Sequence, residues 1–145
     1  MCWRGRCGKD EFCMSDAKCA RLLMEASKRD VEALRGMGDA SVFADEIFGF
    51  HVQQAAEKLL KAWIALLGET YPLTHDLELL FNLLQKRGVD ASDFAGLNEY
   101  TPYAVQFRYE ALGLDAKPLD RQAGLTLVES LLTQVQLQFG REEGA

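Results

Sequence analysis

The 145-residue chain has few residues that bind metals and none of the common catalytic or phosphate-binding motifs. It contains two histidines and four cysteines, the cysteines form no C-x-x-C pair, and neither histidine lies near them in the sequence. This spacing does not favour a zinc site. The sequence also lacks glycine-rich phosphate loops, nucleophile elbows and paired metal-binding carboxylate–histidine motifs. We therefore predict a protein with no metal and no cofactor.

Long apolar runs are missing too. No run approaches the roughly 18 residues that a membrane-spanning helix needs. The start, MCWRGRCGKDEFC, carries basic residues without the apolar stretch of a secretory signal. The net charge of -6 argues against a chain that coats nucleic acid by bulk charge. We expect a cytoplasmic protein that does not enter the membrane.

The length suits a single domain. Residues 1–13 carry glycine, charge and cysteine without a period, so we expect a flexible tail there. Met14, followed by Ser15 and Asp16, looks like a natural start directly before the first helix. The predicted domain spans residues 14–140, and residues 141–145 form a polar tail.

Helical periodicity runs through the whole domain. Apolar residues recur at spacings of three and four in every segment, and no run of alternating β-branched residues indicates a strand. The expected helices cover about residues 15–35, 41–67, 74–87, 93–111 and 120–140, with a break at Pro102 in the fourth. The pattern predicts an all-α fold, an antiparallel up-and-down bundle of about five helices joined by short turns.

Polar and glycine residues give the expected helix ends. Ser41 opens the second helix, and Thr74 and Asp120 are expected to cap the third and the last. Gly68 is placed to end the second helix and Gly140 to end the last.

The stretch from Phe50 to Leu80, FHVQQAAEKLLKAWIALLGETYPLTHDLELL, is the most informative part of the chain. At about 100° per residue its first helix has one broad apolar face. The opposite face is a polar stripe formed by His51, Gln53, Gln54, Glu57, Lys58 and Lys61. On pattern alone this stripe is a solvated surface with a weak Glu57–Lys61 pair.

Particular residue strings add a second interpretation. The run QQAAEKLLKA, the following LTHDLELL and the later pair Arg108-Tyr109 resemble the HEPN family (higher eukaryotes and prokaryotes nucleotide-binding domains). The resemblance covers roughly residues 17–139, and Glu110 departs from the R-Y-P found in many members. It implies the same helical bundle that the periodicity predicts.

Many HEPN proteins are metal-independent ribonucleases, whose motif is an arginine followed after about four to six residues by a histidine. The positions before His51 hold Ala44, Asp45 and Glu46, and those before His75 hold Gly68, Glu69 and Thr70. The tyrosine that some members carry two residues after that histidine is replaced by Gln53 and Leu77. We therefore assign no catalytic residue.

The resemblance without the nuclease motif implies a non-catalytic module that pairs with a minimal nucleotidyltransferase, as in toxin–antitoxin pairs, and binds ATP or GTP. Lysine and arginine would contact phosphate oxygens, and tyrosine would stack on a ring. The expected nucleotide-binding residues are Gln54, Lys58, Lys61, His75, Arg108 and Tyr109. A homodimer is also expected, because HEPN proteins commonly pair.

Two alternatives remain open at this level. One is a ribonuclease that uses a non-standard pair, His51 or His75 with Arg108. The other is a helical homodimer that serves only as a scaffold. Each site residue also has a structural interpretation: His75 as a helix-start hydrogen-bonding residue, His51 at the edge of the core or in a dimer contact, and Arg108 paired with Glu57.

Overall fold

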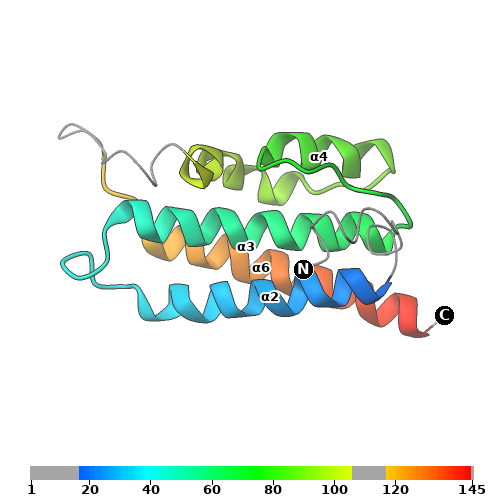
Figure 1. Cartoon of the computed structure of the whole chain (residues 1–145), viewed down its shortest axis with the longest axis horizontal. Helices are drawn as coiled ribbons and strands as arrows, with labels where there is room; N and C mark the ends of the chain where they lie inside the picture. The colour runs from blue at the N-terminus through cyan, green and yellow to red at the C-terminus, as the bar shows by residue number, and fades with distance from the viewer. Residues whose placement is uncertain (1–16, 106–116, 145) are drawn as a thin grey trace.

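The computed structural model describes residues 17–105 and 117–144. Within these residues the elements are α2 (Ala17–Gly36), α3 (Asp45–Leu66), α4 (Leu77–Lys86), the 3-10 helix η1 (Ser92–Ala104) and α6 (Arg121–Gly144), with no strand. The predicted all-α bundle of five helices is confirmed (Figure 1). The predictions for the tail 1–13 and for Arg108 and Tyr109 lie outside the described residues.

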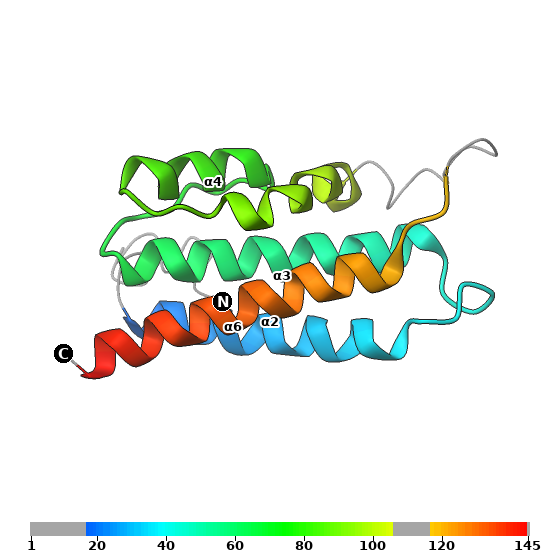
Figure 2. The ribbon, with the colours of Figure 1, turned by 180° about the vertical axis from the view of Figure 1, so that it is seen from behind.

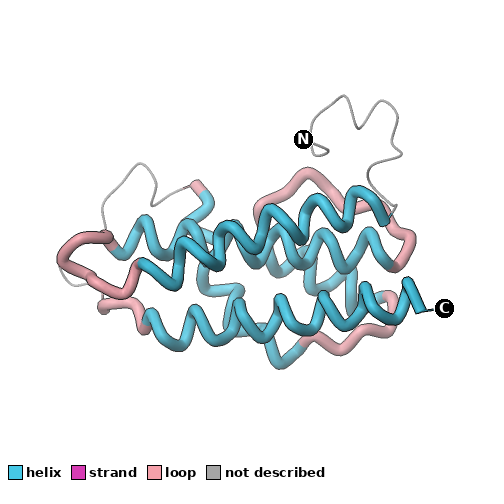
Figure 3. Tube along the Cα trace, turned by 90° about the horizontal axis from the view of Figure 1, so that it is seen from below, coloured by secondary structure: helices cyan, strands magenta, loops and turns pink. Residues whose placement is uncertain are grey.

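The long helix α3 forms the centre of the bundle. α2 and α6 lie along it as two further long rods, and α4 with η1 covers another side (Figures 1 and 2). Because α3 contacts every other helix, 14 of its 22 residues are buried. The view from below shows the same arrangement (Figure 3).

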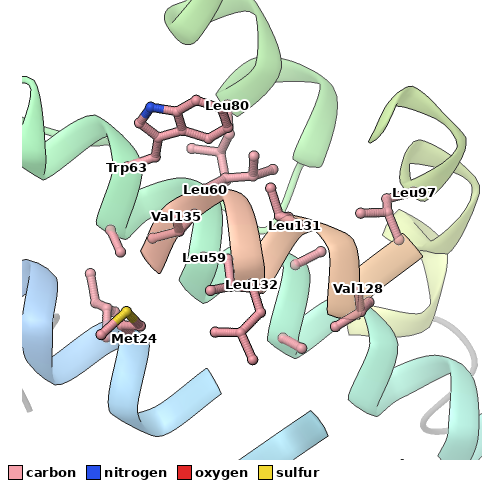
Figure 4. Packing of buried hydrophobic residues seen from close by; sticks show 14 of the residues in the cluster. Met24, Leu59, Leu60, Trp63, Leu80, Leu97, Val128, Leu131, Leu132 and Val135 are labelled. Atoms are coloured by element: carbon pink, nitrogen blue, oxygen red, sulfur yellow. The ribbon is translucent and has the colours of Figure 1, made fainter. Parts of the chain in front are cut away.

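Apolar side chains from all five helices meet around α3. The expected apolar stripe of α2 is buried, and so is most of that of α6. Burial of such side chains is the main stabilising term of the fold, at roughly 25 cal/mol per Å² of apolar surface. Ten residues of this core are labelled in Figure 4: Met24, Leu59, Leu60, Trp63, Leu80, Leu97, Val128, Leu131, Leu132 and Val135.

The start of α3 differs from the expectation. Ser41 does not open the helix, because its backbone N–H and its hydroxyl both donate to Asp39 Oδ1 in a turn. The helix begins at Asp45, after Ala44, whose side chain gives no cap. Its end is as predicted, since Gly68 adopts a φ of 82°, a left-handed conformation that glycine accommodates without strain.

The next two helices also differ in detail. The N-cap of α4 is Asp76, whose carboxylate accepts from the Glu78 N–H. Thr74 lies before the helix, and its Oγ1 accepts from the Asp76 N–H. The Thr74 cap was therefore wrong by two residues. Within the described residues the fourth helix is a 3-10 helix that contains Pro102 and ends at Ala104. The rest of the predicted helix, residues 106–111, lies outside the described residues.

The last helix begins as predicted, since Asp120 Oδ1 accepts from the Ala123 N–H. It does not end at Gly140 but continues to Gly144. A glycine inside a helix costs only about 1 kcal/mol relative to alanine, so it weakens a helix without ending it.

The connection between α3 and α4 places the candidate site. It is extended rather than a short turn, and it runs back along α3, because Gln53 Nε2 donates to the His75 carbonyl at 3.0 Å. α4 then returns until Arg87 Nη2 reaches the Leu67 carbonyl at 3.4 Å. α4 thus runs in the same direction as α3, so the predicted antiparallel order does not hold for these two helices. The connection carries His75 to the middle of α3.

A half-buried arginine at the start of α6 lies at the end of the bundle where α2 ends and α3 begins. Arg121 donates to the Met37 carbonyl at 2.8 Å, to the Phe43 carbonyl at 2.6 Å and to Asp45 Oδ1 at 2.6 Å. Its guanidinium also lies 5.0 Å from the centroid of the Phe48 ring. Arg121 therefore ties the loop between α2 and α3 to α6.

None of the helices in the described ranges is long and apolar enough to cross a membrane.

We expect Gly49→Ala to destabilise the fold, because a Cβ at this position would lie 2.4 Å from Tyr103 Cδ1. The clash involves the root of a buried ring, so the overpacking cost of about 1–3 kcal/mol outweighs the gain in helix propensity of about 1 kcal/mol. Gly140→Ala is the matched control, since nothing lies within 4 Å of its Cβ position, and it should stabilise α6. Urea unfolding followed by circular dichroism checks both, and a stabilised Gly49→Ala variant would contradict the tight contact.

Candidate functional site

Three polar residues on α3, one helical turn apart, are buried. Gln53, Glu57 and Lys61 are 0%, 7% and 5% exposed. The prediction that they belong to a solvated stripe was wrong. The returning connection covers this face of α3, as shown by the His75 contacts and by Lys61 Nζ lying 5.5 Å from the centroid of the Tyr71 ring. We call Gln53, Glu57 and Lys61 the buried ladder.

Glu57 is the centre of the buried ladder. Its Oε1 accepts from Gln53 Nε2 at 3.0 Å and lies 2.9 Å from His75 Nδ1, and its Oε2 accepts from Lys61 Nζ at 2.8 Å. Burial by itself would raise the pKa of Glu57, but the Lys61 charge and these hydrogen bonds together lower it below its ordinary value. Glu57 therefore stays an ionised acceptor in the interior.

His75 stands at the border between the buried ladder and solvent. Its side chain is 59% exposed, while its Nδ1 faces Glu57 and its backbone carbonyl accepts from Gln53. The expected structural hydrogen bond of this histidine is confirmed, and its partner is Glu57. When Nδ1–H donates to the carboxylate, Nε2 carries the lone pair of the neutral ring.

A second cluster joins α2 to the neighbouring side of α3. Asp30 Oδ2 accepts from Lys58 Nζ at 2.7 Å, and Asp30 Oδ1 lies 3.0 Å from His51 Nδ1. Burial would raise the pKa of Asp30, but the hydrogen bonds and charges of His51 and Lys58 lower it below its ordinary value. Gln54 lies between the two clusters and donates to Gln53 Oε1 at 2.8 Å.

The structure brings part of the predicted nucleotide site together. Gln54 and Lys58 are partly exposed on α3, and His75 lies against the same helix. The Lys61 ammonium is instead buried on Glu57. Across Asp30, Glu57, Lys58 and Lys61, two carboxylates balance two ammonium groups, so these four side chains carry no net charge.

Sequence reasoning missed Asp30 and the central role of Glu57. Asp30 had a usable signal, since it lies three residues after Ser27 and four before Leu34, on the apolar stripe of α2. An acid in that position needs a partner, because an unpaired buried charge is costly. The partner itself could not be read from the sequence, because 28 positions separate Asp30 from Lys58.

Acidification should destabilise the protein through these two carboxylates. Asp30 and Glu57 have lowered pKa values in the folded state, so their contribution is complete above the unfolded pKa of about 4 and is lost as pH falls through the folded pKa. Urea unfolding from pH 6 to pH 3 should show this loss, with a shallower decline in Asp30→Asn than in the wild type. Glu25→Gln, an exposed acid on the same helix, is the control, and parallel curves for Asp30→Asn and wild type would contradict the assignment.

Among residues 17–105 and 117–144, no three histidine, cysteine, aspartate or glutamate side chains form a group that could hold a metal ion.

The fold and this surface define an all-α module whose central helix carries a buried Gln–Glu–Lys ladder closed by a histidine from the next connection. The family model of the HEPN domain matches residues 20–136. The chain therefore belongs to the HEPN family. No curated protein and no solved structure matches it.

Proposed function

We propose that this HEPN chain is a nucleotide-binding module that works with a minimal nucleotidyltransferase, in the manner of toxin–antitoxin pairs. The observation that carries the proposal is the placement of Lys58, Gln54 and His75 along one partly exposed side of α3. We call these three residues the α3 strip. Family membership and the missing arginine–histidine spacing favour a binding role over cleavage.

Each residue of the α3 strip has a hydrogen-bonding atom to offer. An ammonium has three donors, and Lys58 directs one of them to Asp30, so the others can meet phosphate oxygens. Gln54 uses its Nε2 on Gln53, which leaves Oε1 to accept from a ribose hydroxyl or a base amine. His75 presents its ring at the edge of the strip. Because the surface is charge-balanced, binding depends on directed hydrogen bonds more than on bulk attraction.

Calorimetric titration with ATP and with GTP tests the site. Wild-type protein should bind one of them saturably, and Lys58→Ala should weaken binding by about tenfold or more, the cost of a charge-assisted hydrogen bond. His75→Ala should weaken it too, by the smaller cost of a neutral hydrogen bond in which His75 Nε2 accepts from a ribose hydroxyl or a base amine. Lys28→Ala is the matched control, since Lys28 is a lysine on α2 paired with Glu25 away from the α3 strip. Absence of heat with both nucleotides, from protein shown to be folded, would overturn the proposed site.

Arg108 and Tyr109 remain part of the proposed site. Both lie outside the described residues, so they are tested only by substitution. Arg108→Ala and Tyr109→Phe belong in the same titration series. Unchanged affinity in both would remove them from the site without affecting the α3 strip.

The protein partner is tested separately. We propose a small nucleotidyltransferase encoded by a neighbouring gene, recognisable by a Gly-Ser pair followed by an Asp-x-Asp motif. Co-expression of the two proteins, one of them tagged, should yield a stable complex. Light scattering during size-exclusion chromatography measures the molar mass and so also tests the proposed homodimer. Failure of the two proteins to co-elute would reject the pairing.

One observation favours a second candidate function, a metal-independent ribonuclease. A buried carboxylate holding Nδ1 of an exposed histidine is the arrangement that enzymes use to orient a general base, and Glu57 and His75 have it. Arg108 would then stabilise the developing phosphate charge. This function requires RNA cleavage that survives EDTA and disappears in His75→Ala, and purified protein that leaves RNA intact would exclude it.

A further inference from the structure

The two histidines of the chain are held in the same way but differ in access. In each, Nδ1 lies about a hydrogen-bond length from a largely buried carboxylate, at 2.9 Å for His75 with Glu57 and at 3.0 Å for His51 with Asp30. The His75 side chain is 59% exposed, against 28% for His51. The chain thus contains an internal comparison between an accessible and a shielded imidazole.

The surroundings of His75 favour reaction at Nε2. Its backbone carbonyl is fixed by Gln53 and its Nδ1 by Glu57, so the ring has a set orientation. Within the described residues no side chain or backbone group hydrogen-bonds Nε2. A carboxylate at Nδ1 raises the electron density at Nε2 and neutralises the positive charge that the ring acquires when Nε2 forms a bond.

His51 differs from His75 in its access, not in its carboxylate. Asp30 is shared with the Lys58 ammonium at 2.7 Å, much as Glu57 is shared with the Lys61 ammonium at 2.8 Å. The ring also lies edge-on to Phe50, with centroids 5.3 Å apart, on the body of α3 rather than on the exposed connection.

We propose that His75 Nε2 is a phosphoryl-accepting site, with a nucleoside triphosphate as donor. The Nε2 lone pair attacks the terminal phosphorus, the Nε2–P bond forms, the bridging P–O bond breaks, and the nucleoside diphosphate leaves with that electron pair. The Nδ1 proton stays between the ring and Glu57, which balances the charge of the phosphoimidazole. Glu57 is a positioning residue in this step, and the choice of donor rests on the proposed nucleotide binding.

A chemical probe tests the acceptor without any nucleotide site. Potassium phosphoramidate transfers its phosphoryl group to accessible imidazoles, with ammonia as leaving group. Peptide mass spectrometry at neutral to alkaline pH, where phosphohistidine survives, should place the label on His75 at least about tenfold faster than on His51, within one wild-type sample. Acid treatment should remove the label, as expected for a phosphorus–nitrogen bond.

The second arm uses ATP and GTP in place of phosphoramidate, beside the calorimetric titration. Label on His75 from either nucleotide supports the whole proposal. If His75 is labelled by phosphoramidate but not by ATP or GTP, and calorimetry shows that a nucleotide binds, the proposal that a nucleoside triphosphate is the phosphoryl donor is wrong. Equal or greater labelling of His51 in the first arm overturns His75 as the acceptor even if nucleotide binds, so the two proposals fail separately.

The role of Glu57 has its own readout. Glu57→Gln should slow phosphoramidate labelling of His75 by about tenfold or more, by analogy with the loss of the carboxylate behind a metal-ligating histidine. Asp30→Asn, the matched change at His51, should leave the His75 rate unchanged. Unaltered labelling in Glu57→Gln would reject the positioning role, and if that variant does not fold, the comparison of His75 with His51 in the wild type still decides the acceptor.

Discussion

Replacement of Glu57 by leucine is expected to cost about 3–5 kcal/mol of folding free energy, because it leaves a buried charge without its partner. Lys61 is 5% exposed and its ammonium is held 2.8 Å from Glu57. The same change removes one of the two acceptors of Gln53 Nε2 and the carboxylate partner of His75 Nδ1. Urea unfolding at neutral pH, followed by circular dichroism, gives the difference.

The double variant Glu57→Leu with Lys61→Met separates lost charge pairing from lost packing. A buried ion pair replaced by apolar side chains of similar volume is often close to neutral, so the second change should recover most of the loss. Glu25→Leu is the control at an exposed pair, where the partner Lys28 stays in water and the effect should be under about 1 kcal/mol. A double variant as unstable as Glu57→Leu alone would show that packing, not charge, carries the effect.

The second large effect is expected for Arg121→Met, at about 2–4 kcal/mol. The change removes the arginine donor from two backbone carbonyls and from Asp45 Oδ1 at the junction of three segments. It also removes the contact between the guanidinium and the Phe48 ring. Thermal and urea unfolding of the purified variant measure the loss.

Arg35→Met supplies the comparison for Arg121. Arg35 also pairs with a carboxylate, Glu129 at 2.8 Å, but its side chain is 53% exposed against 12% for Arg121. An exposed pair contributes about 0–1 kcal/mol, so this variant should stay close to wild type. Equal losses in the two variants would mean that burial of Arg121 has little energetic weight.

Much of the fold could be predicted because its signals are local. Periodic apolar residues place the five helices, and the conformations of Gly68 and the cap at Asp120 follow from residue chemistry alone. The misplaced ends have local causes too. Ser41 and Thr74 are good cap residues, but each serves a turn formed by its neighbours.

The candidate site was less accessible to prediction, because its geometry depends on contacts between distant segments. The pattern put Gln53, Glu57 and Lys61 on one side of α3 but could not show that the connection before α4 covers that side. Arg121 and Asp45 are 76 residues apart, and no periodicity in the sequence indicates that they form an ion pair. What sequence supplied was the set of polar residues, and only the packing decided which of them are buried.

The buried ladder also sets the register in which the connection between α3 and α4 packs on α3. A connection packed on α3 through apolar contacts alone could slide by one helical turn, about 5.4 Å, at modest cost. Here such a slide would take the His75 carbonyl away from Gln53 and the His75 ring away from Glu57, leaving polar groups in the interior unpaired. A single register of the connection therefore satisfies the hydrogen bonds of both Gln53 and Glu57 to His75. We therefore expect the buried ladder to hold the connection in one register, and apolar replacement of the ladder to allow several.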